Sequence, residues 1–186
     1  MKFPDWRAIK LLAKLRNRKD DTIMLAIVEE LAKDGLEVVD QTLYLKPLMP
    51  SCGVLSRRKP TASEEDDIRF GFVTAKAMGG MDIGQTVVVK HKAVMAVEAI
   101  EGTDACIRRG GALGREKSVV VKVAKPNQDP RFDGPAVGKQ TILSMLESHC
   151  NVLAMEAGRT LFVEQDEVLD LANRHDICIC AVDKNF

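Results

Sequence analysis

The sequence has no excess of either charge and very few aromatic side chains. Lys plus Arg and Asp plus Glu both number 27 among 186 residues, and there is one Trp and one Tyr. A neutral chain has no overall attraction for a polyanion, and a chain with so few rings offers no platform on which bases can stack. We therefore expect no nucleic acid partner, and any affinity for phosphate must come from local clusters of charge.

Long apolar runs are also absent, and the cysteines lack a functional spacing. No run approaches the ~20 residues of a transmembrane helix, and the first residues lead into a charged segment instead of a secretory signal. We therefore expect a cytoplasmic protein that at most touches a membrane surface. The five cysteines form neither a zinc motif nor a Cys-x-x-Cys pair. They are expected to be small buried side chains in a reducing compartment.

Residues 1–50 have the pattern of an incomplete α/β unit. Apolar residues recur at helical spacing over 5–19, and the opposite face is basic. A second helix is expected over 20–33, capped by its first or second aspartate and stopped by Gly35. Residues 36–39 then predict a strand. Because the other strands of a sheet are missing, we expect a helical arm left over from a truncated α/β domain.

A turn-rich linker over 46–60 leads into a second domain, which we expect to span 51–186. Thr61 and Glu64 form a capping box that opens a helix ending at Gly79-Gly80. Strand and helix patterns then alternate, which predicts a mixed β-sheet flanked by helices, an α/β fold. The expected strands are 85–90 and 93–100, forming a hairpin, then 119–124, 152–156, 160–163 and 177–182, and the expected helices are 104–109, ended by Gly110-Gly111, then 138–149 and 168–174.

The segment EAIEGTD (98–104) places acidic residues at the end of an apolar strand. Strand ends are where α/β sheets place ligand sites. Glu98 lies within the apolar run, and burying a carboxylate costs several kcal/mol unless it is paired. Thr103 or Asp104 is expected to cap the following helix, whose free N–H groups suit phosphate or carboxylate. The alternative is an ordinary capped helix beside a salt-bridged Glu98.

A second cluster follows the strand that ends near Lys122. Lys122 and Lys125 enter a loop with three prolines that also carries Asp129, Arg131 and Asp133. Two carboxylates suit a hard cation such as Mg²⁺, and Lys and Arg suit phosphate oxygens. Together they predict phosphoryl transfer, in which the metal neutralises the phosphate and positions a water. The alternative is a solvated loop of mixed charge.

At these two clusters the sequence resembles the LpxI-type UDP-2,3-diacylglucosamine pyrophosphatases of lipid A synthesis. Residues 6–45 resemble the last part of that family's N-terminal domain, without its opening strand and glycine-rich start. The resemblance over 51–186 is carried by four segments in the family's order: GVLSRRKPT (53–61), DIGQTVVVKHKAVMAVEAIEGTDACIRR (82–109), VKVAKPNQDPRFDGPAVGKQTI (121–142) and MEAGRTL (155–161).

The resemblance implies a specific reaction. Such enzymes hydrolyse UDP-2,3-diacylglucosamine to UMP and 2,3-diacylglucosamine 1-phosphate (lipid X), with Mg²⁺ and with water attacking the phosphorus on the uridine side. It also implies a lipid-linked UDP-sugar substrate, contact with the inner-membrane surface and a homodimer. Two alternatives stay open. One is a non-catalytic module that binds lipid X or a nucleotide, or that dimerises; the other is a different uridine nucleotide-sugar as substrate.

The same resemblance assigns roles to the charged residues of the two clusters. Asp129 is expected to bind the metal or activate the water, and Asp133, Asp104 and Glu101 to complete the catalytic set. The metal ligands are expected among Asp129, Asp104 and Asp133. Residues expected to bind the substrate, chiefly through its phosphate oxygens, are Lys122, Lys125, Arg131, Gln128, Thr103, Arg108 and Lys90.

Overall fold

The computed structural model describes residues 5–13, 15 and 20–186, without the side chains of residues 20 and 21. The described chain forms two units. The first comprises the residues up to Leu43 together with Asp129–Asp133, and the second comprises Tyr44–Gln128 and Gly134–Phe186. None of the helices in the described residues combines the length and the apolar character that a bilayer crossing requires.

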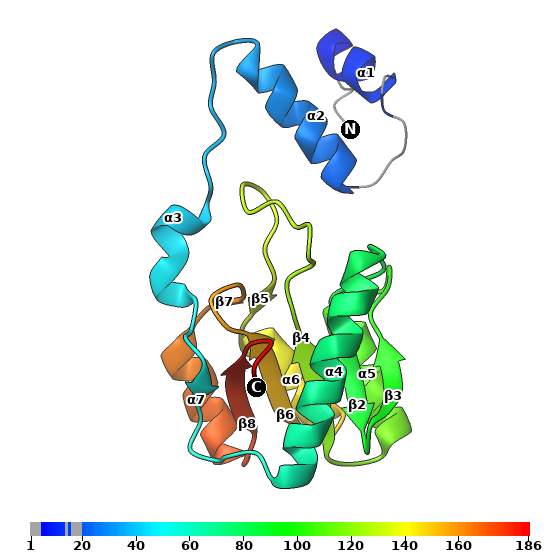
Figure 1. Cartoon of the computed structure of the whole chain (residues 1–186), viewed down its shortest axis with the longest axis vertical. Coiled ribbons are helices and arrows are strands. Elements are labelled where there is room, and N and C mark those ends of the chain that lie inside the picture. Colours follow the sequence, from blue (N-terminus) through cyan, green and yellow to red (C-terminus); the bar gives the residue numbers. More distant parts are fainter. Residues whose placement is uncertain (1–4, 14, 16–19) are drawn as a thin grey trace. The chain divides into compact units, whose positions relative to one another are not determined.

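The first unit contains two helices, α1 (Trp6–Ala13) and α2 (Asp20–Ala32), which are blue in Figure 1. Arg7 joins them, since its guanidinium donates to Glu30 Oε1 at 2.7 Å and to Asp34 Oδ2 at 2.6 Å. Gly35 has a φ of 77°, a left-handed conformation that suits glycine after a helix. The predicted stop at Gly35 is therefore confirmed.

The strand predicted over 36–39 is wrong, because residues 36–40 have no regular secondary structure. A strand needs a neighbour that accepts its hydrogen bonds, and no sheet of the described chain includes this segment. Residues 14 and 16–19 of the predicted first helix, and the side chains of the predicted caps at 20 and 21, lie outside the described residues. A short helix α3 (Thr42–Leu45) and a 3₁₀ turn η1 (Lys46–Leu48) follow.

The second unit is built on a six-stranded mixed sheet in the order β1-β8-β6-β4-β2-β3. Strands β4, β6 and β8 are parallel to one another, whereas β1 and the β2–β3 hairpin are antiparallel additions at the two sides. The predicted fold class is thus confirmed (Figure 1). The strands are β1 (Gly53–Val54), β2 (Thr86–Lys90), β3 (Ala93–Val97), β4 (Ser118–Lys122), β6 (Cys150–Glu156) and β8 (Cys178–Val182), with a separate parallel pair of β5 (Ala136–Val137) and β7 (Leu161–Phe162).

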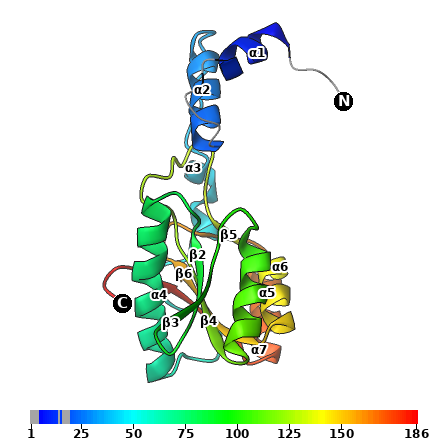
Figure 2. The same ribbon diagram turned by 90° about the vertical axis from the view of Figure 1, so that its right-hand side faces the viewer.

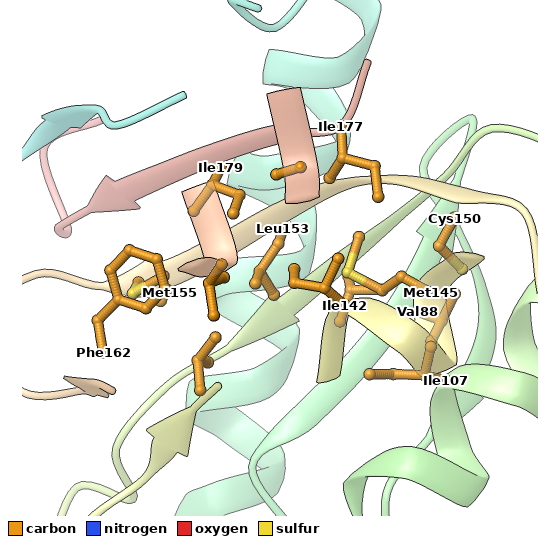
Figure 3. Packing of buried hydrophobic residues seen from close by; sticks show 14 of the residues in the cluster. Val88, Ile107, Ile142, Met145, Cys150, Leu153, Met155, Phe162, Ile177 and Ile179 are labelled. Atoms are coloured by element: carbon orange, nitrogen blue, oxygen red, sulfur yellow. The ribbon is translucent and has the colours of Figure 1, made fainter. Parts of the chain in front are cut away.

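Helices cover both faces of this sheet, as Figure 2 shows, with α4 on one side and α5, α6 and α7 on the other. Side chains alternate along each strand, so Val87 and Val89 join the core under α4 while Val88 joins the core on the opposite face. Figure 3 shows the packing of this second core around Leu153 and Ile142. The helices are α4 (Ala62–Gly80), α5 (Thr103–Gly114), α6 (Lys139–Glu147) and α7 (Gln165–Arg174).

Local signals predicted the start of α4 and the hairpin correctly. The Thr61 Oγ1 accepts from Glu64 N–H at 3.3 Å, and the Glu64 carboxylate accepts from Thr61 N–H at 2.8 Å, which is the predicted capping box. His91 and Lys92 both have positive φ, as a two-residue hairpin turn requires. Buried Asp67 accepts from the N–H groups of both turn residues, which ties the hairpin to α4.

The cysteines are free, and four of the five are buried as expected. Cys178 and Cys180 lie in the core under α4, and Cys106 and Cys150 lie in the core on the opposite face. Cys52 is the exception, since it is exposed. The buried four therefore act as small apolar side chains.

Gly110 and Gly111 do not end α5, contrary to the prediction, because the helix runs on to Gly114. A Cβ at Gly110 would lie 2.4 Å from Val88 Cβ, and one at Gly111 would lie 2.3 Å from the carbonyl oxygen of Ser148. These glycines therefore let α5 approach β2 and the end of α6 closely. The role of the pair is close packing and not termination.

This contact predicts that Gly110→Ala lowers the free energy of unfolding by about 1–3 kcal/mol, because overpacking a core costs that much. The gain in helix propensity, about 1 kcal/mol, offsets only part of a clash at 2.4 Å. Urea unfolding followed by circular dichroism measures the change. Gly134→Ala is the control, since nothing lies within 4 Å of its added Cβ. Equal midpoints for Gly110→Ala and the wild type would contradict the assignment.

Candidate functional site

Polar residues gather where the parallel strands end. Lys122 is the last residue of β4 and Glu156 is the last residue of β6, and these strands run in the same direction. The antiparallel strand β2 begins at this edge with Thr86, which lies opposite Lys122. We refer to this edge of the sheet, where β4 and β6 end and β2 begins, as the carboxyl edge. It is the edge at which open α/β sheets hold their ligands.

The first cluster is a hydrogen-bonded chain of Glu98, Thr103 and Lys122. Thr103 Oγ1 donates to Glu98 Oε1 at 2.8 Å and accepts from Lys122 Nζ at 3.0 Å. Lys122 Nζ also donates to the carbonyl oxygen of Ala136 at 2.9 Å. Glu98 and Lys122 are only 8% and 7% exposed, so both charges depend on such partners. The structure therefore brings Thr103 and Lys122 together, from the two clusters of the sequence.

Gln85 links this chain to the loop that follows β4. Its N–H donates to Glu98 Oε2 at 3.3 Å, and its side-chain Oε1 accepts from Gln128 Nε2 at 3.5 Å. The Gln128 Oε1 in turn accepts from Lys125 N–H at 3.0 Å. Gln128 and Lys125 thus lie at the same edge as Lys122. Gln85 was not among the predicted site residues, although it stands in a segment that carries the family resemblance.

Two ion pairs complete the carboxyl edge. Lys125 Nζ contacts Asp82 Oδ1 at 2.8 Å. Lys76 Nζ, from α4, contacts both oxygens of Glu156 at 2.9 and 3.0 Å. Lys76, Asp82 and Glu156 were not among the residues predicted from the sequence. The only available signal was that Asp82 and Glu156 stand in segments that carry the resemblance.

The amino terminus of α5 is also at this edge, but its cap differs from the prediction. The N-cap residue is Gly102, with a φ of 81° and no side-chain capping bond. Thr103 does not cap the helix because its hydroxyl is held by Glu98, and Asp104 lies half-buried in the first turn. The first N–H groups of α5 therefore keep the partial positive charge that favours an anion.

Other predicted residues are held in different contacts. The Arg109 guanidinium binds the Glu101 carboxylate and holds the pKa of Glu101 below its ordinary value. Arg108 pairs with Glu147 at 2.7 Å on the outer surface of α5 and α6. Lys90 lies at the opposite end of β2, where it donates to the carbonyl oxygens of Gly114 and Glu116. Four residues of strand, roughly 13 Å, separate Lys90 from Thr86 and the carboxyl edge.

Asp129, Arg131 and Asp133 belong to the first unit. Arg131 forks onto Asp129, with Nε 3.0 Å from Oδ1 and Nη2 2.6 Å from Oδ2. This hydrogen bonding holds the pKa of the Asp129 carboxyl below its ordinary value. The N–H of Asp133 donates to the carbonyl oxygen of Asp129 at 3.1 Å, so the segment forms a compact turn. Arg131 also lines a hollow of about 430 Å³ with apolar residues such as Val28 and Leu43.

The residues do not form a ready metal cage. Among the described residues, no three Asp, Glu, His or Cys side chains are grouped so that they could hold a metal ion. Asp129 is engaged by Arg131, and Glu101 is engaged by Arg109. The metal ligands expected at Asp129, Asp104 and Asp133 therefore stay a prediction.

The fold and this edge define an α/β protein whose cationic side chains meet a helix amino terminus at the carboxyl ends of parallel strands. Comparison with known proteins identifies the group to which it belongs. Residues 51–180 match the LpxI C-terminal domain, and residues 1–48 match the LpxI N-terminal domain. The chain is also 31% identical over 192 residues to the UDP-2,3-diacylglucosamine pyrophosphatase LpxI of Caulobacter vibrioides, covering 97% of this chain and 69% of that protein. The chain belongs to the LpxI family.

The Thr103 bridge predicts that Thr103→Val lowers the free energy of unfolding by about 1–3 kcal/mol, since it removes the shorter of the two hydrogen bonds to buried Glu98 and leaves the 3.3 Å bond from the Gln85 N–H. Valine keeps the shape and removes only the hydroxyl. Thr74→Val is the control, because the Thr74 hydroxyl bonds only back to the carbonyl oxygen of Phe70 in its own helix. Urea unfolding of both variants measures the difference. A loss no larger for Thr103→Val than for Thr74→Val would show that the bridge carries no stability.

The Arg131 fork predicts that Arg131→Met raises the pKa of Asp129 toward the ordinary value of about 3.9. A lowered pKa stabilises the folded state above the unfolded pKa, and this contribution disappears as the pH falls through the folded pKa. Titration of the Asp129 carboxyl carbon by NMR measures the shift. Arg159→Met, which removes an exposed arginine, should leave it unchanged. An identical Asp129 titration in Arg131→Met would refute the pairing.

Proposed function

We propose that the chain hydrolyses the pyrophosphate bond of UDP-2,3-diacylglucosamine, releasing UMP and lipid X. The observation that carries this proposal is the position of buried Lys122, which is tied to Thr103 at the carboxyl edge beside the amino terminus of α5. The chain also belongs to the LpxI family, and its Caulobacter relative is a UDP-2,3-diacylglucosamine pyrophosphatase by name. This relationship supports the same substrate class.

The carboxyl edge offers groups that suit a diphosphate. The edge has three sets of hydrogen-bond donors: the ammonium groups of Lys122 and Lys125 and the first N–H groups of α5. The ammonium groups are positively charged and the N–H groups carry partial positive charge, so their hydrogen bonds to phosphate oxygens are strong. These donors are held in place by Thr103, Asp82 and Gln128 before any substrate arrives. Fixed donors of this kind stabilise the extra charge of a phosphoryl-transfer transition state without reorganisation.

Asp129 and Arg131 supply the second part of the proposal. A phosphate oxygen accepts from guanidinium in the same forked geometry as a carboxylate, so any phosphate group that binds Arg131 competes with Asp129 for it. Transfer of Arg131 to the phosphate would release Asp129 and raise its pKa, because the pairing is what lowers that pKa. The freed carboxylate then orients the attacking water, which is the role that the family resemblance implies for Asp129.

A binding module is the second candidate function. It is favoured by the Arg131–Asp129 fork, which occupies the carboxylate that hydrolysis would need. In that case lipid X or UMP would bind to the same groups, and no bond would be broken. The two candidates differ in turnover and not in affinity, so both must be measured.

The test is release of UMP from UDP-2,3-diacylglucosamine in detergent micelles by the whole chain. In ¹⁸O-water, label in UMP reports attack at the uridine-side phosphorus. We expect Asp129→Ala to lower kcat by about 10²–10⁴-fold, the usual contribution of a group that handles a proton or orients water. Asp170→Ala, on the exposed face of α7, should leave kcat unchanged. EDTA in the same assay tests the expected Mg²⁺ requirement.

Unchanged turnover in Asp129→Ala would refute the assigned role of that residue. Calorimetry with lipid X and with UMP decides between the two candidates. Binding of either ligand by a chain that releases no UMP supports the module, and label incorporated into UMP excludes it.

A further inference from the structure

The ion pair of Lys76 and Glu156 lies behind the predicted phosphate-binding residues. Lys76 comes from α4 and Glu156 from the end of β6, so the pair joins the sheet to the helix that covers one face. Glu156 is 8% exposed, and Lys76 Nζ lies within 3.0 Å of both its carboxylate oxygens. None of the predicted site residues belongs to this pair.

The pair binds both backbone polar groups of Ala124, its N–H and its carbonyl oxygen. Lys76 Nζ donates to the carbonyl oxygen of Ala124 at 2.8 Å, and the N–H of Ala124 donates to Glu156 Oε2 at 2.8 Å. Strand β4 has already ended at Lys122, so these two bonds take the place of a strand partner. The last backbone bond from the sheet side is that of the Val123 N–H to the carbonyl oxygen of Gln85 at 3.0 Å, and the side chains of Lys76 and Glu156 hold the chain from Ala124 on.

The end of α4 also holds Lys125, the residue after Ala124. A Cβ at Gly79 would lie 3.3 Å from Lys125 Cα, so helix and loop are in close contact there. The chain turn after α4 carries Asp82, which binds the Lys125 ammonium group. Ala124 and Lys125 are therefore fixed from α4 at the point where the chain turns toward Gln128.

A buried ion pair is a poor source of stability, because desolvation offsets much of the attraction, and an apolar pair of the same size is often as stable. A charged pair that also binds the N–H and the carbonyl oxygen of one residue fixes the backbone on both sides of its Cα, which an apolar pair cannot do. We propose that Lys76 and Glu156 are positioning residues, which clamp the backbone at Ala124 so that Lys122, Lys125 and Gln128 face the diphosphate. The identity of the substrate in this inference rests on the proposed function. The geometry rests on the contacts of Lys76 and Glu156 with Ala124.

The test compares Glu156→Ala with Glu64→Ala. Glu64 is a matched control, since it is also a partly buried glutamate paired with a cation, Arg58, in the same unit, with side-chain exposure of 13% against 10% for Glu156. It lies at the start of α4, away from Ala124. Lys76→Met is a second variant in case Glu156→Ala does not fold, and Lys76→Arg is the conservative replacement.

We expect Glu156→Ala and Lys76→Met to lower kcat by about 100-fold with little change in KM, as a displacement of about 1 Å in catalytic groups does. Lys76→Arg should recover most of the activity, and Glu64→Ala should keep the wild-type kcat even if it unfolds at a lower temperature. In amide hydrogen exchange, Ala124, Lys125 and Gln128 should exchange faster in Glu156→Ala and Lys76→Met but not in Glu64→Ala.

Equal loss of kcat in Glu156→Ala and Glu64→Ala, or unchanged exchange at Ala124, Lys125 and Gln128, would overturn the clamp. If the wild-type chain releases no UMP, the proposed hydrolysis fails, and the exchange comparison alone still decides the clamp. Faster exchange confined to these amides would then support it.

Discussion

Two carboxylates buried at the end of the sheet, those of Glu98 and Glu156, must find partners, and this requirement organises the rest of the candidate site. An ionised carboxylate out of water is stable only when it is hydrogen-bonded or paired. Thr103 and Gln85 satisfy Glu98, while Lys76 and the Ala124 N–H satisfy Glu156. These partners come from α5, α4 and two loops. The hydrogen bonds and ion pairs of the two carboxylates therefore fix where those elements meet the sheet.

Much of the fold was predictable because its signals are local. The capping box of α4 and the valine-rich strands follow from residues that are neighbours in sequence. The errors arise where the deciding contact is tertiary. Gly110 resembles a helix stop, yet it is required by Val88 of another element. Residues 36–39 have strand propensity but no partner in the described chain, and the two-residue strands β1 and β5 are too short to leave a pattern.

The candidate site was predictable in part for the same reason. Lys122 and Thr103 lie at or just after the ends of apolar strands. Because open α/β sheets bind ligands at strand ends, both residues were predicted to belong to the site. Lys76 is one of several charged residues on α4, and nothing in its neighbours distinguishes it from a solvated lysine. Its role depends on Glu156, which is 80 residues away. Lys90 was predicted from the sequence but lies outside the site. It belongs to a segment that resembles the family, yet it lies at the end of β2 opposite the carboxyl edge.

The charge of the carboxyl edge constrains how a diphosphate can bind there. The side chains described at this edge carry no excess of positive charge, since Lys76, Lys122 and Lys125 stand beside Glu98, Glu156, Asp82 and Asp104. A diphosphate adds negative charge to this set, so its binding requires a further cation or the displacement of an existing pair. Mg²⁺ commonly binds through one or two carboxylates together with substrate phosphates and not through a protein cage. The lack of a preformed three-acid cluster in the described residues is therefore compatible with the metal requirement that the family resemblance implies.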